Sequence, residues 1–378
     1  MNKRTLELRW WVVLVGVLLA PMAWAQNGPD LCIANRGEIR VQKGTASCSA
    51  DGVGSIAIAK GDGATAEATN GNRNKAKAMG DDSSAIATFG DDNTATVRGD
   101  DGSAASGGWA EAGDRNTATV RGDGGTARAQ GGDDNEATVN GDESFASASI
   151  GDGNTAAVNG DGSSATAGYG DANTATVDGD EGRATARDGV GNVATVVGDD
   201  SEAEAMFGDA NSASVVGDDS EASARNGDAN TATVVGNESD GFAGVGNGNI
   251  TTVEGDGNVA SAGVGDGNEA KVVGSDNEAR SGDGDGNVTA IEGDGNTAVA
   301  LEGDGNTATV EGNDSEARAW YGDDNRADVK GDGSTARSGF ADRASASVEG
   351  DGSTAIATGT DDCTVNVTGD GAYSDTCE

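Results

Sequence analysis

Histidine is absent from this 378-residue sequence, proline occurs only twice, and aromatic residues make up 3% of it. Without histidine the chain can form neither a His-dependent catalytic triad nor a histidine-ligated metal site. The aromatic residues are too few for the core of an ordinary globular domain of this length. The 65 acidic residues outnumber 24 Lys and Arg and give a net charge of −41. Such an acidic surface repels phosphate groups. We therefore expect cations, basic surfaces or minerals as partners, and no nucleic acid.

Long apolar runs are also scarce. The one at 10–20 follows three positively charged residues, precedes a small-x-small segment at 23–25, and is too short to span a bilayer comfortably. This order is typical of a secretory signal peptide. We therefore predict that residues 1–25 are a signal peptide and that the protein is secreted, to the extracellular space or the cell surface, without a membrane segment after cleavage. An uncleaved anchor helix is the alternative.

What the sequence does contain is a nineteen-residue repeat, clearest at 170–188. Asparagine recurs at this interval from Asn116 to Asn325, and Val or Ile follows each Asn four residues later. Each repeat has halves of nine and ten residues with the shared pattern Gly-Asp-x-(Asn/Ser)-x-Ala-x-(Val/Ala)-x. One break, of four extra residues around Trp109, lies just upstream. A fixed period of this size indicates a solenoid and outweighs the disorder that the composition alone would suggest.

Within each half, turn residues precede a short alternating strand. In the strand after Asn173, that Asn, Ala175 and Val177 share one face, and Thr174 and Thr176 share the other. The first set is nearly constant between repeats and the second varies. We therefore predict an all-β parallel solenoid, or β-roll, with nineteen-residue coils, two strands per coil and a thin Ala/Val/Asn/Ser interior. The Asn side chains are expected to bond their copies above and below as an amide ladder, or else to cap their own turns.

Four cysteines lie in two local pairs, Cys32 with Cys48 and Cys363 with Cys377. An even number in an exported chain suggests disulfides, and these local pairs are the most economical of three pairings. Reduced thiols and crossed pairing are the alternatives. Because the end strands of a solenoid present unpaired backbone groups, we predict disulfide-bonded caps at 26–60 and 360–378, on either side of repeats at 61–359.

Aspartate follows the turn glycine in most halves, so stacked coils should carry a column of carboxylates along each of two corners. Neighbouring carboxylates about 5 Å apart repel by roughly 1 kcal/mol in water, which is consistent with solvated turn residues. The alternative is that Ca²⁺ binds between adjacent turns, and no other cofactor is expected. Its candidate ligands are Asp152, Asp171, Asp209, Asp228, Asp266, Asp285 and Asp304.

Several repeat families resemble this pattern. The segments from Asn173 to Gly179 and from Ser201 to Ala205 are similar to head repeats of YadA-like trimeric autotransporters, which implies a β-roll that adheres to host matrix. The nonapeptide from Gly303 to Glu311 resembles the RTX repeat of Ca²⁺-bound β-rolls. RTX repeats ligate the metal through Asp at the sixth position, where this chain has Ala308, so their mode of binding is not implied. The Gly-x-x-Asn-x-Ala spacing is similar to curli-type repeats, without their Gln lane.

Outward Thr-x-Thr pairs recur on the first strand of the coil. Threonine suits exposed strand positions, but flat Thr-x-Thr arrays are also what solenoid ice-binding proteins use. The candidate ice- or surface-binding residues are Thr94, Thr96, Thr117, Thr119, Thr174, Thr176, Thr231, Thr233, Thr307 and Thr309.

The last residue of the ten-residue half forms a further column, which is apolar in many coils, as at Phe89, Tyr169 and Phe340. Its place in the alternation predicts that it points inward and fills a corner. The alternative is a partly exposed apolar stripe that binds a partner. Trp109 in the four-residue insertion is the bulky residue most expected to protrude.

Repetition itself argues against catalysis, because tandem acidic pairs mark no single cleft. We therefore expect a secreted, non-enzymatic solenoid that acts as an extracellular adhesive or matrix protein, without a required cofactor. The alternative is recognition of ice or a mineral through the Thr-x-Thr face or the Asp columns.

Overall fold

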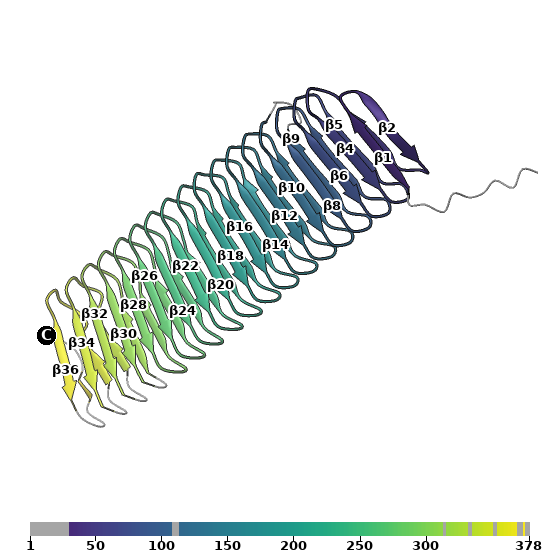
Figure 1. Cartoon of the computed structure of the whole chain (residues 1–378). Helices are drawn as coiled ribbons and strands as arrows, with labels where there is room; N and C mark the ends of the chain where they lie inside the picture. The colour runs from purple at the N-terminus through teal and green to yellow at the C-terminus, as the bar shows by residue number, and fades with distance from the viewer. Residues whose placement is uncertain are drawn as a thin grey trace, which may run out of the picture.

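The computed structural model is a long rod built of β-strands (Figure 1). It describes residues 30–107, 113–312, 315–331, 335–350, 354–368 and 373–374. Every described element is a strand, which confirms the predicted all-β solenoid. Within these ranges no helix is long and apolar enough to cross a membrane. The predicted signal peptide and Trp109 lie outside the described residues.

The strands form two sheets, and each coil contributes one strand to each of them. Sheet A has 19 strands, namely β1 (Leu31–Asn35), β2 (Glu38–Lys43), β4 (Ile56–Lys60), β6 (Lys75–Met79), β8 (Thr94–Arg98), β10 (Thr117–Arg121), β12 (Glu136–Asn140), β14 (Thr155–Asn159), β16 (Thr174–Asp178), β18 (Val193–Val197), β20 (Ser212–Val216), β22 (Thr231–Val235), β24 (Ile250–Glu254), β26 (Glu269–Val273), β28 (Val288–Glu292), β30 (Thr307–Glu311), β32 (Arg326–Lys330), β34 (Ser345–Glu349) and β36 (Thr364–Thr368). Sheet B contains β3 (Ser47–Ala50), β5 (Thr65–Thr69), β7 (Ser84–Thr88), β9 (Ser103–Gly107), β11 (Thr126–Gln130), β13 (Phe145–Ser149), β15 (Ser164–Gly168), β17 (Arg183–Arg187), β19 (Glu202–Met206), β21 (Glu221–Arg225), β23 (Asp240–Ala243), β25 (Val259–Ala262), β27 (Glu278–Ser281), β29 (Thr297–Ala300), β31 (Glu316–Ala319), β33 (Thr335–Arg337), β35 (Thr354–Ile356) and β37 (Tyr373–Ser374).

Equivalent strands pair in parallel with a constant register. Thr155 of β14 lies opposite Thr174 of β16, nineteen residues later. The four-residue insertion does not shift this register, because Thr94 of β8 still lies opposite Thr117 of β10. A given position of the repeat therefore forms a straight column along the rod, and each face carries one kind of chemistry over many coils.

The interior is as thin as the alternation predicts. Ala175 and Val177 are buried, whereas Thr174 and Thr176 are partly exposed, which confirms the assignment of the two faces. The sheets approach so closely that a Cβ added at Gly182 would lie 2.8 Å from Cγ1 of Val177. Valine in one half of the coil is thus matched by a very small residue in the other, which is how a chain with few large side chains fills its core.

The buried Asn lane joins successive coils, but not through the predicted side-chain-to-side-chain ladder. The backbone N–H of Asn192 donates to Oδ1 of Asn173 over 2.9 Å, and Nδ2 of Asn173 donates to the carbonyl of Gly189 over 2.8 Å. Ser163 performs the same task in the other half, where its Oγ accepts from the N–H of Gly182 at 3.1 Å. The predicted bond between copies one coil apart is therefore present, but it joins side chain to backbone, because the next turn brings its own backbone within reach of each side chain.

A hairpin covers the N-terminal end of sheet A. Strand β1 pairs antiparallel with both β2 and β4, and a disulfide joins Cys32 to Cys48 with a Cα–Cα distance of 5.6 Å. The predicted N-terminal disulfide is confirmed. At the other end Cys363 is buried, but Cys377 lies outside the described residues, so their pairing stays a prediction.

Alternation predicted that the apolar column at the end of the ten-residue half points inward and fills a corner, and this prediction was wrong. Phe89, Ile150, Tyr169 and Phe207 are each about half exposed, with values between 47% and 52%. All four have a left-handed backbone, with φ between 55° and 59°, and this turn of the chain reverses the side that the alternation assigns. Left-handed φ is unfavourable for aromatic and β-branched residues, so an exposed apolar side chain here is not explained by folding alone.

Candidate functional site

The outer surface of sheet A carries a continuous face rich in hydroxyl groups. We define the hydroxyl face as the first and third residues of the sheet A strands from β8 to β24, which are the even-numbered strands in this range. Threonine or serine occupies most of these positions, and Glu136 is the only charged residue among them. Eight of the ten predicted Thr residues belong to this face. Thr307 and Thr309 lie apart on β30, beyond the charged Glu269 and Lys271 of β26.

The geometry of the hydroxyl face follows from that of parallel strands. Equivalent residues of neighbouring coils are about 4.8 Å apart, and residues two apart in one strand are about 6.6 Å apart. Each threonine is half-buried between its neighbours, as Thr119 is between Thr96 and Thr138. The face therefore presents methyl and hydroxyl groups in a rigid two-dimensional array, which suits contact with a flat, repetitive surface or with ordered water.

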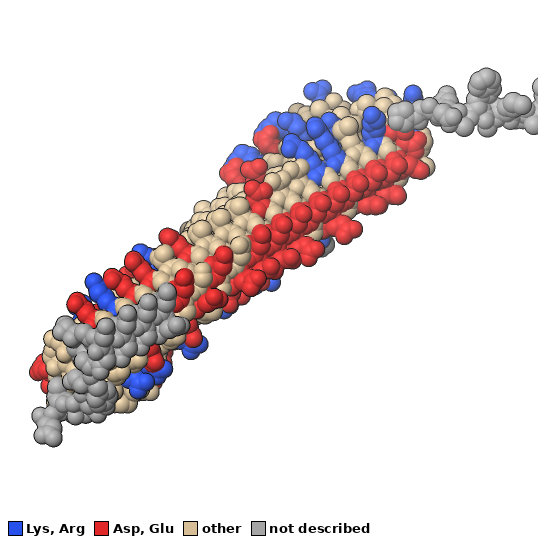
Figure 2. Space-filling model, turned by 90° about the horizontal axis from the view of Figure 1, so that it is seen from below, with Lys and Arg blue, Asp and Glu red and all other residues tan. Residues whose placement is uncertain are grey.

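Rows of acidic side chains run along the rod, and Lys and Arg are densest near its N-terminal end and appear again toward its C-terminal end (Figure 2). In the predicted Ca²⁺ column, each carboxylate accepts a hydrogen bond from the turn before it. The backbone N–H of Asp152 donates to Oδ1 of Asp171 over 2.9 Å, and that of Asp209 donates to Asp228 over 2.8 Å. Asp266, Asp285 and Asp304 continue this pattern. The carboxylates are therefore coil-to-coil connectors, a role that the sequence analysis did not anticipate.

Two interruptions show what this column requires. Val190 stands between Asp171 and Asp209, and Asn247 stands between Asp228 and Asp266. The Asn247 side chain accepts the N–H of Asp228 over 2.8 Å, as an Asp would. Val190 offers no side-chain oxygen to the preceding coil, so the turn can form without this bond. Where the bond is present, an amide oxygen serves as well as a carboxylate, so the negative charge is not required. Among the described residues no three Asp, Glu, Cys or His side chains converge on one point as metal ligands. A Ca²⁺ ion between coils would have to use the second oxygen of each carboxylate.

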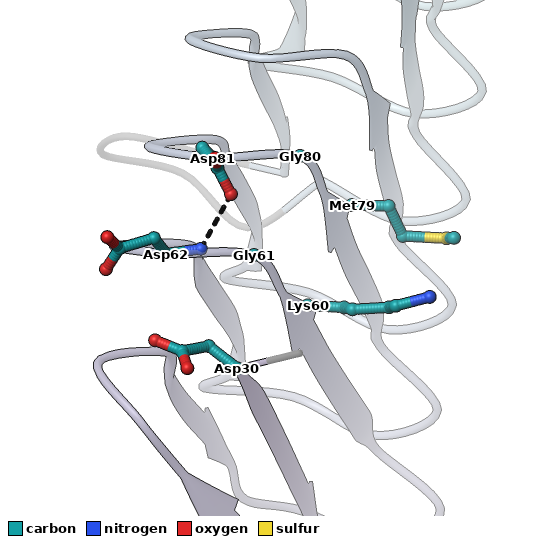
Figure 3. A pocket seen from close by; sticks show the side chains of 7 residues that line it. All are labelled: Asp30, Lys60, Gly61, Asp62, Met79, Gly80 and Asp81. Atoms are coloured by element: carbon teal, nitrogen blue, oxygen red, sulfur yellow. Dashed lines mark hydrogen bonds between the residues drawn. The ribbon is translucent and has the colours of Figure 1, made fainter. Parts of the chain in front are cut away.

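The same arrangement lines a hollow of about 540 Å³ at the N-terminal end of the other acidic column (Figure 3). The backbone N–H of Asp62 donates to Oδ1 of Asp81 over 2.8 Å. Asp30 accepts bonds from the N–H and the hydroxyl of Thr45, and these bonds lower the pKa of its carboxyl. Lys60 extends on the opposite side of the strand from these acids. The carboxylates of this hollow are thus held by structural bonds and do not point at a common ligand.

Arginines form a second set of connections that the sequence analysis missed. Arg115 pairs with Asp134 in the next coil through an Nε–Oδ1 contact of 2.6 Å, and Arg343 pairs with Asp362 in the same way. The hydrogen bond from each arginine lowers the pKa of its aspartate. A search for opposite charges nineteen residues apart would have found these pairs, because stacked coils turn that separation into contact.

A scan against known family models and a search of curated proteins both find no match for this chain. The resemblance to YadA-like, RTX and curli-type repeats therefore remains a prediction, and function has to be argued from the surfaces of the rod.

Proposed function

We propose that this protein is a secreted, non-enzymatic rod that acts as an extracellular adhesive or matrix element and binds extended surfaces through its side. The observation that carries this proposal is the constant register of the coils, which repeats one outward pattern from β8 to β24. Many weak, identical contacts on a rigid body add up to firm attachment, because the ordering entropy is lost only once.

The hydroxyl face is the part of the rod best suited to such contact. On a chain with a net charge of −41, its first and third strand positions carry a single charged side chain, and the further charges of this surface, Arg98, Arg121, Asp178 and Glu254, lie along one edge at the fifth position. Desolvating the hydroxyl face against another surface is therefore less costly than desolvating the acidic corners. Its Thr side chains are held by strand neighbours and lose little freedom on binding.

A matched pair of variants tests this proposal. Thr176 of sheet A and Thr166 of sheet B are both half-buried third residues of adjacent strands. Purified mature protein should co-sediment with at least one of cellulose, peptidoglycan, collagen and hydroxyapatite. We expect Thr176→Lys to reduce retention severalfold and Thr166→Lys to leave it unchanged. Absence of retention on all four, or equal loss in both variants, would reject adhesion through the hydroxyl face.

Ice or mineral recognition is the second candidate, and the regular array of uncharged Thr-x-Thr pairs favours ice. An ice-binding face would produce thermal hysteresis and shaped ice crystals in solutions of the purified protein, and Thr176→Lys should abolish both. An adhesive without affinity for ice would show neither effect, so this measurement separates the two functions. Binding to hydroxyapatite that depends on the Asp columns would instead support mineral recognition.

A further inference from the structure

Three of the few aromatic residues converge near the C-terminal end of sheet B. The ring centroids of Trp320 and Phe340 are 5.3 Å apart at an interplanar angle of 73°, and those of Tyr321 and Phe340 are 5.3 Å apart at 9°. Trp320 is the only tryptophan in the part of the chain that the structure describes. Tyr321 is 44% exposed and Phe340 61% exposed. These rings therefore form a preorganised apolar platform that faces solvent.

The platform borders a groove of about 550 Å³ that crosses the outer surface of β27, β29 and β31. Leu301 and Val299 supply apolar surface between the rings and the polar side, where Glu278 and Arg280 lie. Mixed apolar surface with a few polar groups, in a hollow of this size, is typical of ligand sites. A groove that follows the rod also suits an extended ligand.

The polar groups of the groove are present as pairs. Nε of Arg280 lies 2.6 Å from a carboxylate oxygen of Glu278, and Arg318 makes the equivalent pair with Glu316. The Arg318 guanidinium also lies over the Trp320 ring, 5.6 Å from its centroid. The groove thus offers hydrogen-bond donors and acceptors while the charges of these pairs cancel.

This combination favours one class of occupant. An anionic chain would meet paired arginines on a strongly acidic rod, and a second copy of the rod would add its own negative charge. An uncharged polyhydroxylated chain avoids both penalties. The C–H groups of a sugar ring carry partial positive charge and pack on the electron-rich face of an aromatic ring, and its hydroxyls can bond the paired guanidinium and carboxylate groups.

We propose that this groove binds a neutral polysaccharide, with sugar rings packed on the Trp320–Tyr321–Phe340 platform and hydroxyls bonded by Arg280 and Glu278. This site lies on sheet B near the C-terminal end and is separate from the hydroxyl face, so it goes beyond the adhesive function proposed above. The two can fail independently, since Thr176→Lys tests one and the groove variants test the other.

Affinity electrophoresis provides the test, because the acidic protein migrates readily through native gels. The probes are mixed-linkage β-glucan, arabinoxylan, galactomannan, dextran and soluble starch, each cast in the gel. We expect at least one of them to retard the mature protein and Trp320→Ala to weaken binding by about tenfold or more. Phe207→Ala is the control, because Phe207 lies outside the groove in the column of Tyr321 and is exposed to a similar extent, 48% against 44%. Its retardation should equal that of the unmodified protein.

A second readout reports on Trp320 directly. Only Trp109 and Trp320 lie downstream of residue 25, so Trp109→Phe leaves a single tryptophan in the mature chain, which can be excited selectively over the three tyrosines. The retarding polysaccharide should shift the emission of Trp320 and protect it from acrylamide. The proposal is overturned if no probe retards the protein, or if Trp320→Ala is retarded as strongly as the unmodified chain. It is also overturned if sedimentation shows that Trp320 mediates self-association and no probe protects it.

Discussion

At the scale of a residue, the two faces of a strand differ sharply in what they tolerate, as Val177 and Thr176 illustrate. Val177 is buried between the sheets. Val177→Asp places an unpaired charge there and should lower the free energy of unfolding by about 4 kcal/mol or more. Thr176→Asp places its charge in solvent, between Ala157 and Thr195 of the adjacent coils, and should cost less than about 1 kcal/mol. Urea unfolding measures both, and equal losses would contradict the assignment of the faces.

The buried polar lane gives a second residue-scale prediction. Asn173→Ala removes the acceptor for the N–H of Asn192 and the donor to the carbonyl of Gly189. Leaving such buried groups unpaired costs about 1–3 kcal/mol each, so the melting temperature should fall clearly. Asn173→Ser should recover part of this loss, because Ser163 makes the equivalent bonds in the other lane. A serine variant no more stable than the alanine variant would show that the lane depends on amide geometry.

The sequence predicts whether a side chain is buried or exposed only where strand alternation alone determines the direction in which it points. Alternation alone placed Val177 inside and Thr176 outside, because a strand has a period of two. It could not place Phe89 or Tyr169, since their left-handed backbone reverses the side that alternation assigns. Nor could it identify the backbone partner of Asn173, because the spacing of the repeats gives the distance between coils and not the path of the next turn.

At the scale of an element, sheet B contains a short acidic column that should respond to pH. Glu202, Glu221 and Asp240 begin neighbouring strands, with Arg183 preceding them. Partial burial raises the pKa of Glu202 above its ordinary value of 4.5, and Glu204 and Glu221 raise it further, against the opposing effect of Arg183. The folded state therefore holds this proton more tightly than the unfolded state does. Its contribution to stability grows as the pH falls from 7 through the raised pKa, and it levels off below about 4.5.

Glu202→Gln removes this titration. The variant should be slightly more stable than the parent at pH 7, and its melting temperature should rise less between pH 7 and pH 4.5. The effect is small, because the side chain is 35% exposed and water screens its charge. Glu136→Gln is the matched control, because its neighbours in adjacent coils are the uncharged Thr117 and Thr155. A parental pH profile in Glu202→Gln would show that the acidic column does not govern this response.

At the scale of the whole molecule, the acidic corners set the stability of the rod against its ionic surroundings. Register could be predicted from the nineteen-residue period, and with it the existence of the columns. The bond from each N–H to the carboxylate of the next coil could not, because it depends on how the turn orients Asp171 toward Asp152. Each aspartate in this column contributes an acceptor oxygen and a negative charge. Replacement by asparagine keeps the oxygen and removes the charge, as Asn247 already does in the parent chain.

The triple replacement Asp152→Asn, Asp171→Asn and Asp209→Asn tests which property matters. If repulsion dominates, the variant should melt at a higher temperature than the parent in low salt, and the difference should shrink as NaCl is added. Asp171→Ala is the control, since it removes the acceptor together with the charge. It should be less stable than Asp171→Asn at every salt concentration.

Calcium distinguishes screening from site binding in the same variants. If ions only screen, NaCl and CaCl₂ at equal ionic strength should raise the melting temperature of the parent about equally. If Ca²⁺ bridges successive turns through the second carboxylate oxygens, it should stabilise the parent at far lower concentration by mass action, and the triple variant should lose that gain. We expect screening with weak, multiple Ca²⁺ association, because each carboxylate already has one oxygen bonded to the adjacent turn and the sixth position of the nonapeptide is Ala308. Micromolar, stoichiometric Ca²⁺ binding by each coil, detected by calorimetry and absent from the triple variant, would prove this expectation wrong.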